Sequence, residues 1–252
     1  MKKSLAMTAL ALAAGCAALP ARAEDPSLIL RGRIAYTPRY NQLTLNESRT
    51  IEPHPADRGF ISGAAQVRAG NGWEFFVVRP GVEIAKSLGK LELTAGLDLE
   101  LNFDGQIIQP KDGPTMSDYK QQPGDSRPEG SGSFAMDYFQ RKFLGIQPFV
   151  GLSFKTDTLR FFVNGFIPIQ KATRKWGHHR YDEFEEVGSE TYDMKGFGVR
   201  AGFTGLDTPK NEFSEGPNAG LEVSYESYSL TSSNGDDAGK LDSFSLGVVC
   251  NF

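Results

Sequence analysis

Residues 91–104 read LELTAGLDLELNFD, a stretch in which apolar side chains alternate with polar ones or glycine. A strand, whose side chains repeat every two residues, places all the apolar groups on one face, whereas a helix of period 3.6 scatters them. The stretch is also longer than the roughly 9–11 residues that a tilted strand needs to cross a bilayer. It therefore predicts a transmembrane strand with one lipid-facing side and one charged side.

Seven further segments show the same alternation with different clarity: 28–37, 73–86, 143–155, 159–170, 193–204, 219–230 and 241–252. The connections between them alternate in length. Tight turns lie at 87–90 and 155–158, a moderate connection at 205–218, and long polar loops at 105–138 and 171–192. Bacterial barrels have short periplasmic turns and longer extracellular loops. The order predicts an all-β, antiparallel, up-and-down transmembrane barrel of eight strands with both chain ends in the periplasm.

Residues 38–72 leave a ten-stranded barrel as an alternative. We expect a long first extracellular loop here, although 61–69 alternates and Asn71-Gly72 is a strong hairpin signal. Two added strands at about 41–50 and 60–70 would place Glu47 and Arg49 on the lipid face, where an arginine costs roughly 2–4 kcal/mol at the midplane. That cost favours eight strands, with the Asn-Gly hairpin projecting above the membrane.

The N-terminus has the three parts of a secretory signal. Lys2 and Lys3 precede an apolar run from Leu5 to Leu19, and Ala21-Arg22-Ala23 is a small-x-small cleavage site. We therefore expect residues 1–23 to be a signal peptide cleaved after Ala23, and 24–252 to be the barrel. A lipoprotein signal with Cys16 as the lipidated residue is the alternative, although Leu12 lies one position too far from the cysteine.

Composition excludes several classes of protein. No run of about 18 apolar residues follows the N-terminus, so the chain is not a helical membrane protein. Cleavage would leave Cys250 as the single cysteine, which excludes a disulfide framework. The net charge is -4 and there is no long basic run, so nucleic acid is not an expected partner. The 252 residues fit one domain.

The C-terminal strand carries the most specific signal. Phe244, Leu246, Val248, Cys250 and Phe252 alternate, and the chain ends on the aromatic residue. This ending resembles the terminal signature of bacterial outer-membrane proteins, which the barrel-assembly machinery recognises. Together with the signal peptide and the strand pattern, the mature chain resembles the small OmpA-type barrels. The resemblance implies the bacterial outer membrane as the location, with its lipid and lipopolysaccharide as surroundings, and it brings no functional motif.

Aromatic residues near the expected strand ends fit the two interfacial girdles of such barrels. They are Tyr36, Trp73, Phe103, Phe154, Phe161, Phe203, Tyr225 and Phe252. The alternative is core packing in a soluble barrel, but the opposite faces are charged rather than apolar. A soluble calyx of the lipocalin type is disfavoured for the same reason.

The inward positions predict an ionic interior. The candidates are Arg31, Arg33, Arg79, Glu83, Glu92, Asp98, Glu100, Arg160, Arg200, Glu222 and Glu226. An eight-stranded barrel is just wide enough for side chains to fill it. We interpret the set as a salt-bridged plug that holds the barrel shut, because unpaired charges inside would be costly. A narrow porin-like channel for small solutes is the alternative, since charged lumen residues also tune selectivity.

The histidines give little support to the alternative of an enzymatic barrel, such as a lipid-modifying enzyme or a protease. His54, His178 and His179 are the only ones, and the last two are followed by several carboxylates in 171–192. There is no Gly-x-Ser-x-Gly elbow and no His-x-Ser pair, and adjacent histidines on a strand point to opposite faces. We therefore expect no enzyme, no metal site and no cofactor.

The extracellular loops are the best candidates for function, because binding residues concentrate on loops held by a rigid scaffold. The segment 171–192 combines aromatic and charged residues suited to a surface ligand: Trp176, His178, His179, Arg180, Tyr181 and Phe184. The sequence thus predicts a non-enzymatic, monomeric outer-membrane barrel that contributes to envelope structure or binds a ligand at the cell surface.

Overall fold

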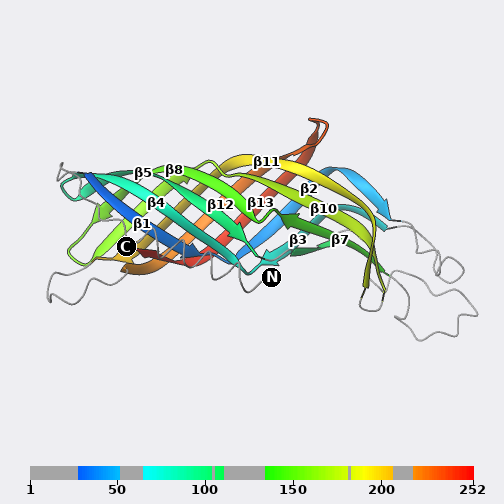
Figure 1. The fold of residues 1–252 in the computed structure, drawn as a ribbon, viewed down its shortest axis with the longest axis horizontal. Coiled ribbons are helices and arrows are strands. Elements are labelled where there is room, and N and C mark those ends of the chain that lie inside the picture. The colour runs from blue at the N-terminus through cyan, green and yellow to red at the C-terminus, as the bar shows by residue number, and fades with distance from the viewer. Residues whose placement is uncertain (1–27, 52–64, 104–105, 111–133, 181–182, 207–217) are drawn as a thin grey trace, which may run out of the picture.

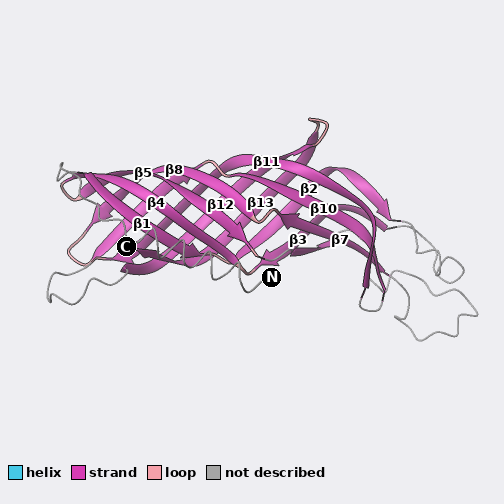
Figure 2. Cartoon of the chain, viewed as in Figure 1, coloured by secondary structure: helices cyan, strands magenta, loops and turns pink. Residues whose placement is uncertain are grey.

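The computed structural model describes residues 28–51, 65–103, 106–110, 134–180, 183–206 and 218–252. Every regular element in these residues is a β-strand (Figures 1 and 2). The strands are β1 (Leu28–Tyr36), β2 (Arg39–Ile51), β3 (Ala65–Glu74), β4 (Val77–Leu88), β5 (Leu91–Asn102), β6 (Gln106–Pro110), β7 (Phe134–Arg141), β8 (Leu144–Lys155), β9 (Leu159–Phe166), β10 (Ile169–Arg180), β11 (Glu183–Gly205), β12 (Asn218–Ser232) and β13 (Asp237–Asn251). Among the described residues there is no helix long and apolar enough to span a membrane.

The thirteen strands build a barrel of eight long strands, here called walls, because five of the eight walls are each interrupted once. Two-residue breaks separate β1 from β2, β3 from β4, β7 from β8 and β9 from β10, and a three-residue break separates β5 from β6. Two of the breaks contain proline, Pro38 and Pro168, which cannot donate to a strand ladder. The antiparallel ring runs β1–β4–β5–β8–β9–β11–β12–β13 and closes from β13 to β1. The prediction of an eight-stranded up-and-down barrel is confirmed.

The ten-stranded alternative and the expected loop over 38–72 are both wrong. β2 and β3 continue the walls of β1 and β4 and pair with each other, and Asn71 and Gly72 lie inside this ladder opposite Gln42 and Asn41. The Asn-Gly pair is therefore not a hairpin turn. Local turn propensity is overridden here because the ladder satisfies the backbone hydrogen bonds of both strands at once.

The long loops expected at 105–138 and 171–192 are also shorter than predicted. β6 and β7 occupy the two ends of the first segment. β10 and β11 pair along nearly all of the second, from Ile169 opposite Lys195 to Arg180 opposite Glu183. The polar residues that suggested loops are those of strands whose outer face meets water rather than lipid, which removes the apolar alternation by which a membrane strand is recognised.

The outward face of the barrel carries a continuous apolar belt. Side chains that would be core residues in a soluble protein are exposed here, for example Val150, Leu152, Val163, Leu246 and Phe197. Their strand neighbours point inward and are charged, as Glu92 and Asp98 are on β5. This inverted arrangement, with the apolar face outside and the ionic face inside, is that of a barrel that spans a membrane.

Aromatic side chains border the belt at both ends. The upper girdle comprises Tyr36, Tyr40, Trp73, Phe75, Phe76, Phe103, Phe143, Phe197, Tyr225 and Phe244, and the lower girdle Phe154, Phe161, Phe203 and Phe252. Ring centroids of neighbours on adjacent strands lie close, at 5.3 Å for Phe103 and Phe143 and 6.2 Å for Phe161 and Phe203. The predicted girdle residues all belong to one of these two rings.

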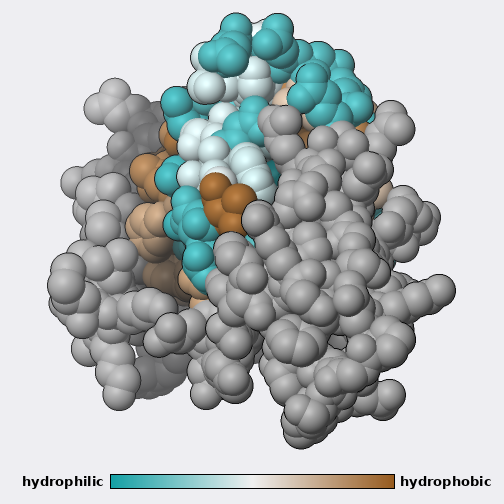
Figure 3. Space-filling model, turned by 90° about the vertical axis from the view of Figure 1, so that its right-hand side faces the viewer, coloured by the Kyte–Doolittle hydropathy of each residue, from teal (hydrophilic) through white to brown (hydrophobic). Residues whose placement is uncertain are grey.

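The walls continue well beyond the upper girdle. β11 has 23 residues, which at roughly 3.3 Å per residue span about 75 Å, more than twice what a membrane crossing needs. The extension includes β2, β3, β7, β10 and the first half of β11, at the end of the molecule opposite the C-terminus (Figure 1). The chain therefore ends at the short-turn side, which is the periplasmic side of a bacterial barrel. The described part of the extracellular end is largely hydrophilic (Figure 3).

Candidate functional site

The lumen is the most highly organised part of the molecule, and it is filled by side chains. The membrane-spanning part holds seven arginines and seven carboxylates from seven of the eight walls. They are Arg31, Arg33, Arg39, Arg79, Arg141, Arg160 and Arg200, with Glu74, Glu83, Glu92, Asp98, Glu100, Glu222 and Glu226. The equal numbers allow a buried array without net charge, apart from Lys155 at the rim. The ion pairs lie in three tiers.

The periplasmic tier links β1, β4, β5 and β9. Arg31 donates to Glu83 at 3.0 Å and to Glu92 at 2.6 Å. Arg160 also pairs with both carboxylates, with its Nε 3.0 Å from Glu92. The Lys155 ammonium reaches Glu92 from the edge of the barrel. Each carboxylate is thus shared by two arginines from different walls, which ties the strands together at this end.

The middle tier centres on Glu222 of β12. Its carboxylate accepts from Arg33 at 2.7 Å and from Arg79, and the Nε of Arg200 lies 4.0 Å away. Asp98 balances the excess positive charge by accepting from Arg200, with Arg33 Nε at 3.6 Å. One carboxylate therefore faces three guanidinium groups, and its loss would leave positive charges uncompensated in a dry interior.

Aromatic rings complete the coordination of the middle tier. The Arg200 guanidinium lies 4.4 Å from the ring centroid of Phe149 and 5.1 Å from that of Phe166. The rings fit because glycine lies opposite them: a Cβ on Gly198 would be 2.2 Å from Cζ of Phe166, and one on Gly96 would be 2.5 Å from Cζ of Phe149. Cation–π contact offsets the lack of acceptors for two of the Arg200 nitrogens among the described residues.

The upper tier joins two arginines to three carboxylates. Arg39 binds Glu74 at 2.5 Å, Glu100 at 2.6 Å and Glu226 at 3.1 Å. Arg141 lies within 4 Å of the same three carboxylates, at 3.4, 3.8 and 3.5 Å. Each of the two arginines is at most 2% exposed. Almost none of the surface of either arginine is therefore accessible to water.

An apolar layer lies above the upper tier and inside the extension. It consists of Leu43, Leu45, Phe139, Ala172, Tyr192, Met194, Tyr228, Leu230 and Leu241, all at most 2% exposed. The side chains come from six walls and meet across the axis of the barrel. The expectation of a wholly ionic interior is therefore incomplete, because the upper half of the lumen is packed like the core of a soluble protein.

All eleven predicted interior residues point into the lumen and take part in the ion-pair network. Arg39, Glu74 and Arg141 were missed, and they form most of the upper tier. Arg39 lies in the segment 38–72 that was interpreted as a loop, Glu74 lies in the expected strand 73–86, and Arg141 lies between the expected loop 105–138 and the expected strand 143–155. The signal that would have found Arg39 is the alternation Arg39, Asn41, Leu43, Leu45, whose inward face changes from polar to apolar along one strand.

The candidate surface residues are placed differently from the expectation. Trp176, His178, His179 and Arg180 lie on β10 rather than in a loop, and Tyr181 lies outside the described residues. His178 is only 5% exposed, so it belongs to the inner face of the extension and not to a solvated cluster. No group of three or more histidine, cysteine, aspartate or glutamate side chains suited to a metal ion occurs in the described part of the chain.

The C-terminal residues that resemble an assembly signal line the outside of β13. Phe244, Leu246, Val248 and Phe252 are each 46–61% exposed, and the intervening Val249 and Asn251 point inward. A hollow of about 230 Å³ lies at the extracellular mouth above the apolar layer, and the residues around it include Glu47, Arg174 and Glu190. It is shallow, because Tyr192 of the apolar layer lines it as well.

Comparison with known proteins yields structural neighbours only. No known protein family matches the chain, and no curated protein matches it in sequence. Neisserial surface protein A is 12% identical, with 90% of this chain and 97% of that one covered and a TM-score of 0.31. Ail of Yersinia pestis, solved with the heparin analogue sucrose octasulfate, is 11% identical over 88% and 99%, with a TM-score of 0.35. The outer membrane protein OprG of Pseudomonas aeruginosa is 12% identical over 88% and 96%, with a TM-score of 0.26. The assignment of the fold rests on the strand pairing itself.

Proposed function

We infer that this protein is a non-enzymatic outer-membrane barrel with a closed lumen, which acts at the cell surface through its β-extension. The observation that carries the inference is the packing of the lumen. Side chains that line a water-filled channel are accessible to water, whereas Arg39, Arg141, Phe139, Met194 and Leu230 are at most 2% exposed. A solute would have to displace both the upper ionic tier and the apolar layer.

The extension supplies a rigid platform for contacts outside the membrane. The β10–β11 hairpin is held by an unbroken ladder except for one bulge at Trp176/Gly177. Ring contacts such as Tyr138 with Phe184, at 4.6 Å, fix it against the neighbouring wall. Surface recognition is favoured when the binding groups are held by a scaffold that does not have to be ordered on binding.

Planar-bilayer recording tests the closed lumen against the porin alternative. The purified barrel is expected to give no stable current steps. As a matched control, the same chain carrying Phe139→Gly, Met194→Gly and Leu230→Gly removes three side chains of the apolar layer and should raise the frequency of openings. Stable, reproducible steps from the unmodified protein would refute the proposal and favour a narrow channel.

A complementation experiment tests the role of the extension. Residues 176–188 are replaced by a two-residue turn between Lys175 and Ser189, which face each other in the ladder. The control replaces only 233–236 in the β12–β13 turn. The two variants are expressed in a strain that lacks the protein. The control is expected to restore the surface property that the strain has lost, and the variant with the shortened hairpin is not. Both barrels are expected to show heat-modifiable gel mobility. Full rescue by the shortened chain would assign the function to the barrel wall instead.

A further inference from the structure

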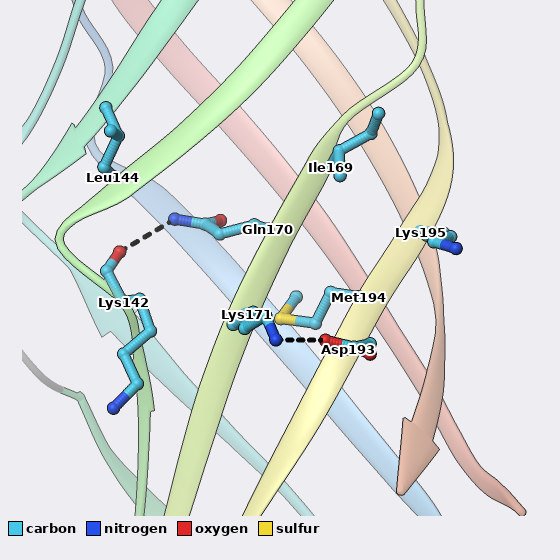
Figure 4. Close-up of a pocket in the computed structure, with 8 residues that line it drawn as sticks. All are labelled: Lys142, Leu144, Ile169, Gln170, Lys171, Asp193, Met194 and Lys195. Atoms are coloured by element: carbon cyan, nitrogen blue, oxygen red, sulfur yellow. Dashed lines mark hydrogen bonds and ion pairs between the residues drawn. The ribbon is translucent and has the colours of Figure 1, made fainter. Parts of the chain in front are cut away.

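A hollow opens in the outer wall just above the apolar belt (Figure 4). Its volume is about 440 Å³, and three walls contribute its lining: Lys142 and Leu144 at the junction of β7 and β8, Ile169, Gln170 and Lys171 of β10, and Asp193, Met194 and Lys195 of β11. It is separate from the ionic tiers and from the mouth of the barrel. Of its lining residues, only Met194 also belongs to the apolar layer that closes the lumen.

The hollow exists because the ladder between two walls is interrupted. Ile169 pairs with Ile146, and the next pair is Ala172 with Arg141. The two pairs are three residues apart on β10 and five residues apart on the β7–β8 wall. The two extra residues bulge, and the Lys142 amide donates to the Lys171 carbonyl at 2.7 Å across the gap. Bulges of this kind re-aim side chains and end regular pairing, and they are frequent beside functional sites.

The rim of the hollow is positively charged. Lys142, Lys171 and Lys195 are exposed side chains on three adjacent walls. Asp193 pairs with Lys171 at 3.1 Å, whereas Lys142 and Lys195 have no ion pair with any residue that the structure describes. Three ammonium groups against one carboxylate make the rim complementary to an anion that carries more than one charge.

The depth of the hollow in the membrane is set by the residues below it. Leu144 and Ile169 are exposed members of the apolar belt. Phe143 of the upper girdle directly follows Lys142, and Phe197 lies two residues after Lys195. Aromatic girdles lie at the level of the lipid headgroups. Lys142 and Lys171 therefore lie at the height of the headgroups of the outer leaflet, and Lys195, which faces Ile169 in the ladder, lies at the border with the acyl region.

The floor of the hollow holds an unsatisfied acceptor. Gln170 is 6% exposed, and its Nε2 donates to the Lys142 carbonyl at 3.0 Å. Its Oε1 is buried and has no hydrogen-bond partner among the described residues. A buried acceptor without a donor costs about 1–3 kcal/mol, so a hydroxyl or amide N–H that reaches it would be bound favourably.

We propose that this hollow binds the phosphorylated amino-sugar headgroup of an outer-leaflet glycolipid. The phosphate would lie among Lys142, Lys171 and Lys195, and a sugar hydroxyl or amide N–H would donate to Gln170 Oε1. The acyl chains would lie along Leu144 and Ile169. An anionic phospholipid offers the charge and the chains but has no sugar amide to reach the glutamine. The proposal relies on the outer-membrane placement inferred above, and its test uses variants outside the apolar layer and outside the hairpin segment 176–188.

Native mass spectrometry of the purified barrel in detergent, with bisphosphorylated lipid A as the probe, tests the site. The double variant K142Q/K195Q is expected to weaken lipid A binding about tenfold, since two charge contacts at an exposed site are lost. The control K86Q/K90Q makes the same change of charge at the periplasmic end, where both lysines are exposed, and should bind as the unmodified chain does. Heat-modifiable mobility shows that each variant is folded and membrane-compatible.

Two further comparisons separate the possible ligands. Q170L keeps the lysines and removes the acceptor, so it is expected to weaken lipid A while leaving phosphatidylglycerol binding unchanged. Dephosphorylated lipid A should bind less well than the bisphosphorylated form, and millimolar inorganic phosphate should not displace it. Equal binding of lipid A and phosphatidylglycerol, or equal losses in the two lysine double variants, would overturn the proposal. Failure of the barrel to fractionate with outer membranes would instead overturn the inferred location.

Discussion

Glu222→Gln is the substitution that examines the ionic lumen most directly. The change keeps the shape of the side chain and removes the one carboxylate that faces Arg33, Arg79 and Arg200. Asp98 then remains as the nearest anion for Arg33 and Arg200. Removing one partner from a buried ion pair typically destabilises a protein by about 3–5 kcal/mol. At about 1.4 kcal/mol per tenfold, the unfolding equilibrium shifts by two to nearly four orders of magnitude.

The assay is urea unfolding in lipid vesicles, followed by tryptophan fluorescence and by gel mobility without boiling. Glu186→Gln is the matched control, because it also removes a carboxylate from an ion pair, but both partners are exposed on the extension. Its transition midpoint is expected to match that of the unmodified protein. The double variant Glu222→Gln/Arg79→Gln should recover part of the loss, because one uncompensated charge is removed together with its partner.

A loss below about 1 kcal/mol for Glu222→Gln would refute the reasoning, because only a hydrated ion pair is worth so little. The middle tier would then be open to water, and the closed lumen would be untenable. A loss of unfolding free energy in the double variant that exceeds the sum of the losses in the two single variants would contradict the pairing of Arg79 with Glu222.

Three other predictions concern the apolar layer, the interior glycines and the extension. Leu230→Ala should cost about 2–5 kcal/mol in urea unfolding, as for a packed core leucine, whereas the lipid-facing Leu152→Ala should cost clearly less; similar losses would contradict the difference in burial. Gly198→Ala should cost about 1–3 kcal/mol of stability, because the new Cβ would overlap the ring of Phe166. Gly165→Ala should be neutral, because a Cβ there has nothing within 4 Å. A neutral result at both positions would show that the Phe166 ring moves freely. The pKa of Tyr192 is raised by burial and by its hydrogen bond to a glutamate, so its contribution to stability should be complete below about pH 10 and be lost as the pH rises toward the raised value. Tyr192→Phe should reduce this alkaline loss in a pH series of unfolding midpoints. An unchanged pH profile would contradict the burial of the Tyr192 hydroxyl.

The sequence contained enough to predict the membrane-embedded half. Alternation such as that of residues 91–104 has one physical cause, a wall between lipid and a polar interior, and it therefore located the apolar belt, the girdles and eleven of the interior charges without a structure. Eight walls were preferred to ten because the added strands would have placed Glu47 and Arg49 on the lipid face. The belt, the girdles and the inward charges are local features, because each depends only on which of the two strand faces a side chain occupies.

The extension could not be predicted in the same way. Above the upper girdle the outer face of each strand meets water, so the alternation on which the prediction depended disappears, and β2, β3 and β10 were interpreted as loops. Arg39 was missed with β2, whereas Glu74 lay within the expected strand 73–86 and Arg141 lay just before the expected strand 143–155. Their role depends on which strands are neighbours in the ring, and pairing between residues as distant as Arg39 and Glu226 is decided by closure of the whole sheet.

What the sequence by itself determined is the two-faced strand, because period two and the preference of apolar groups for lipid are properties of single segments. Only the tertiary structure decided which charges meet, where the lumen changes from ionic to apolar, and that the ladder breaks beside Lys142 to leave a hollow in the wall. These features arise from the register between strands, and register is fixed only when all eight walls close into one ring.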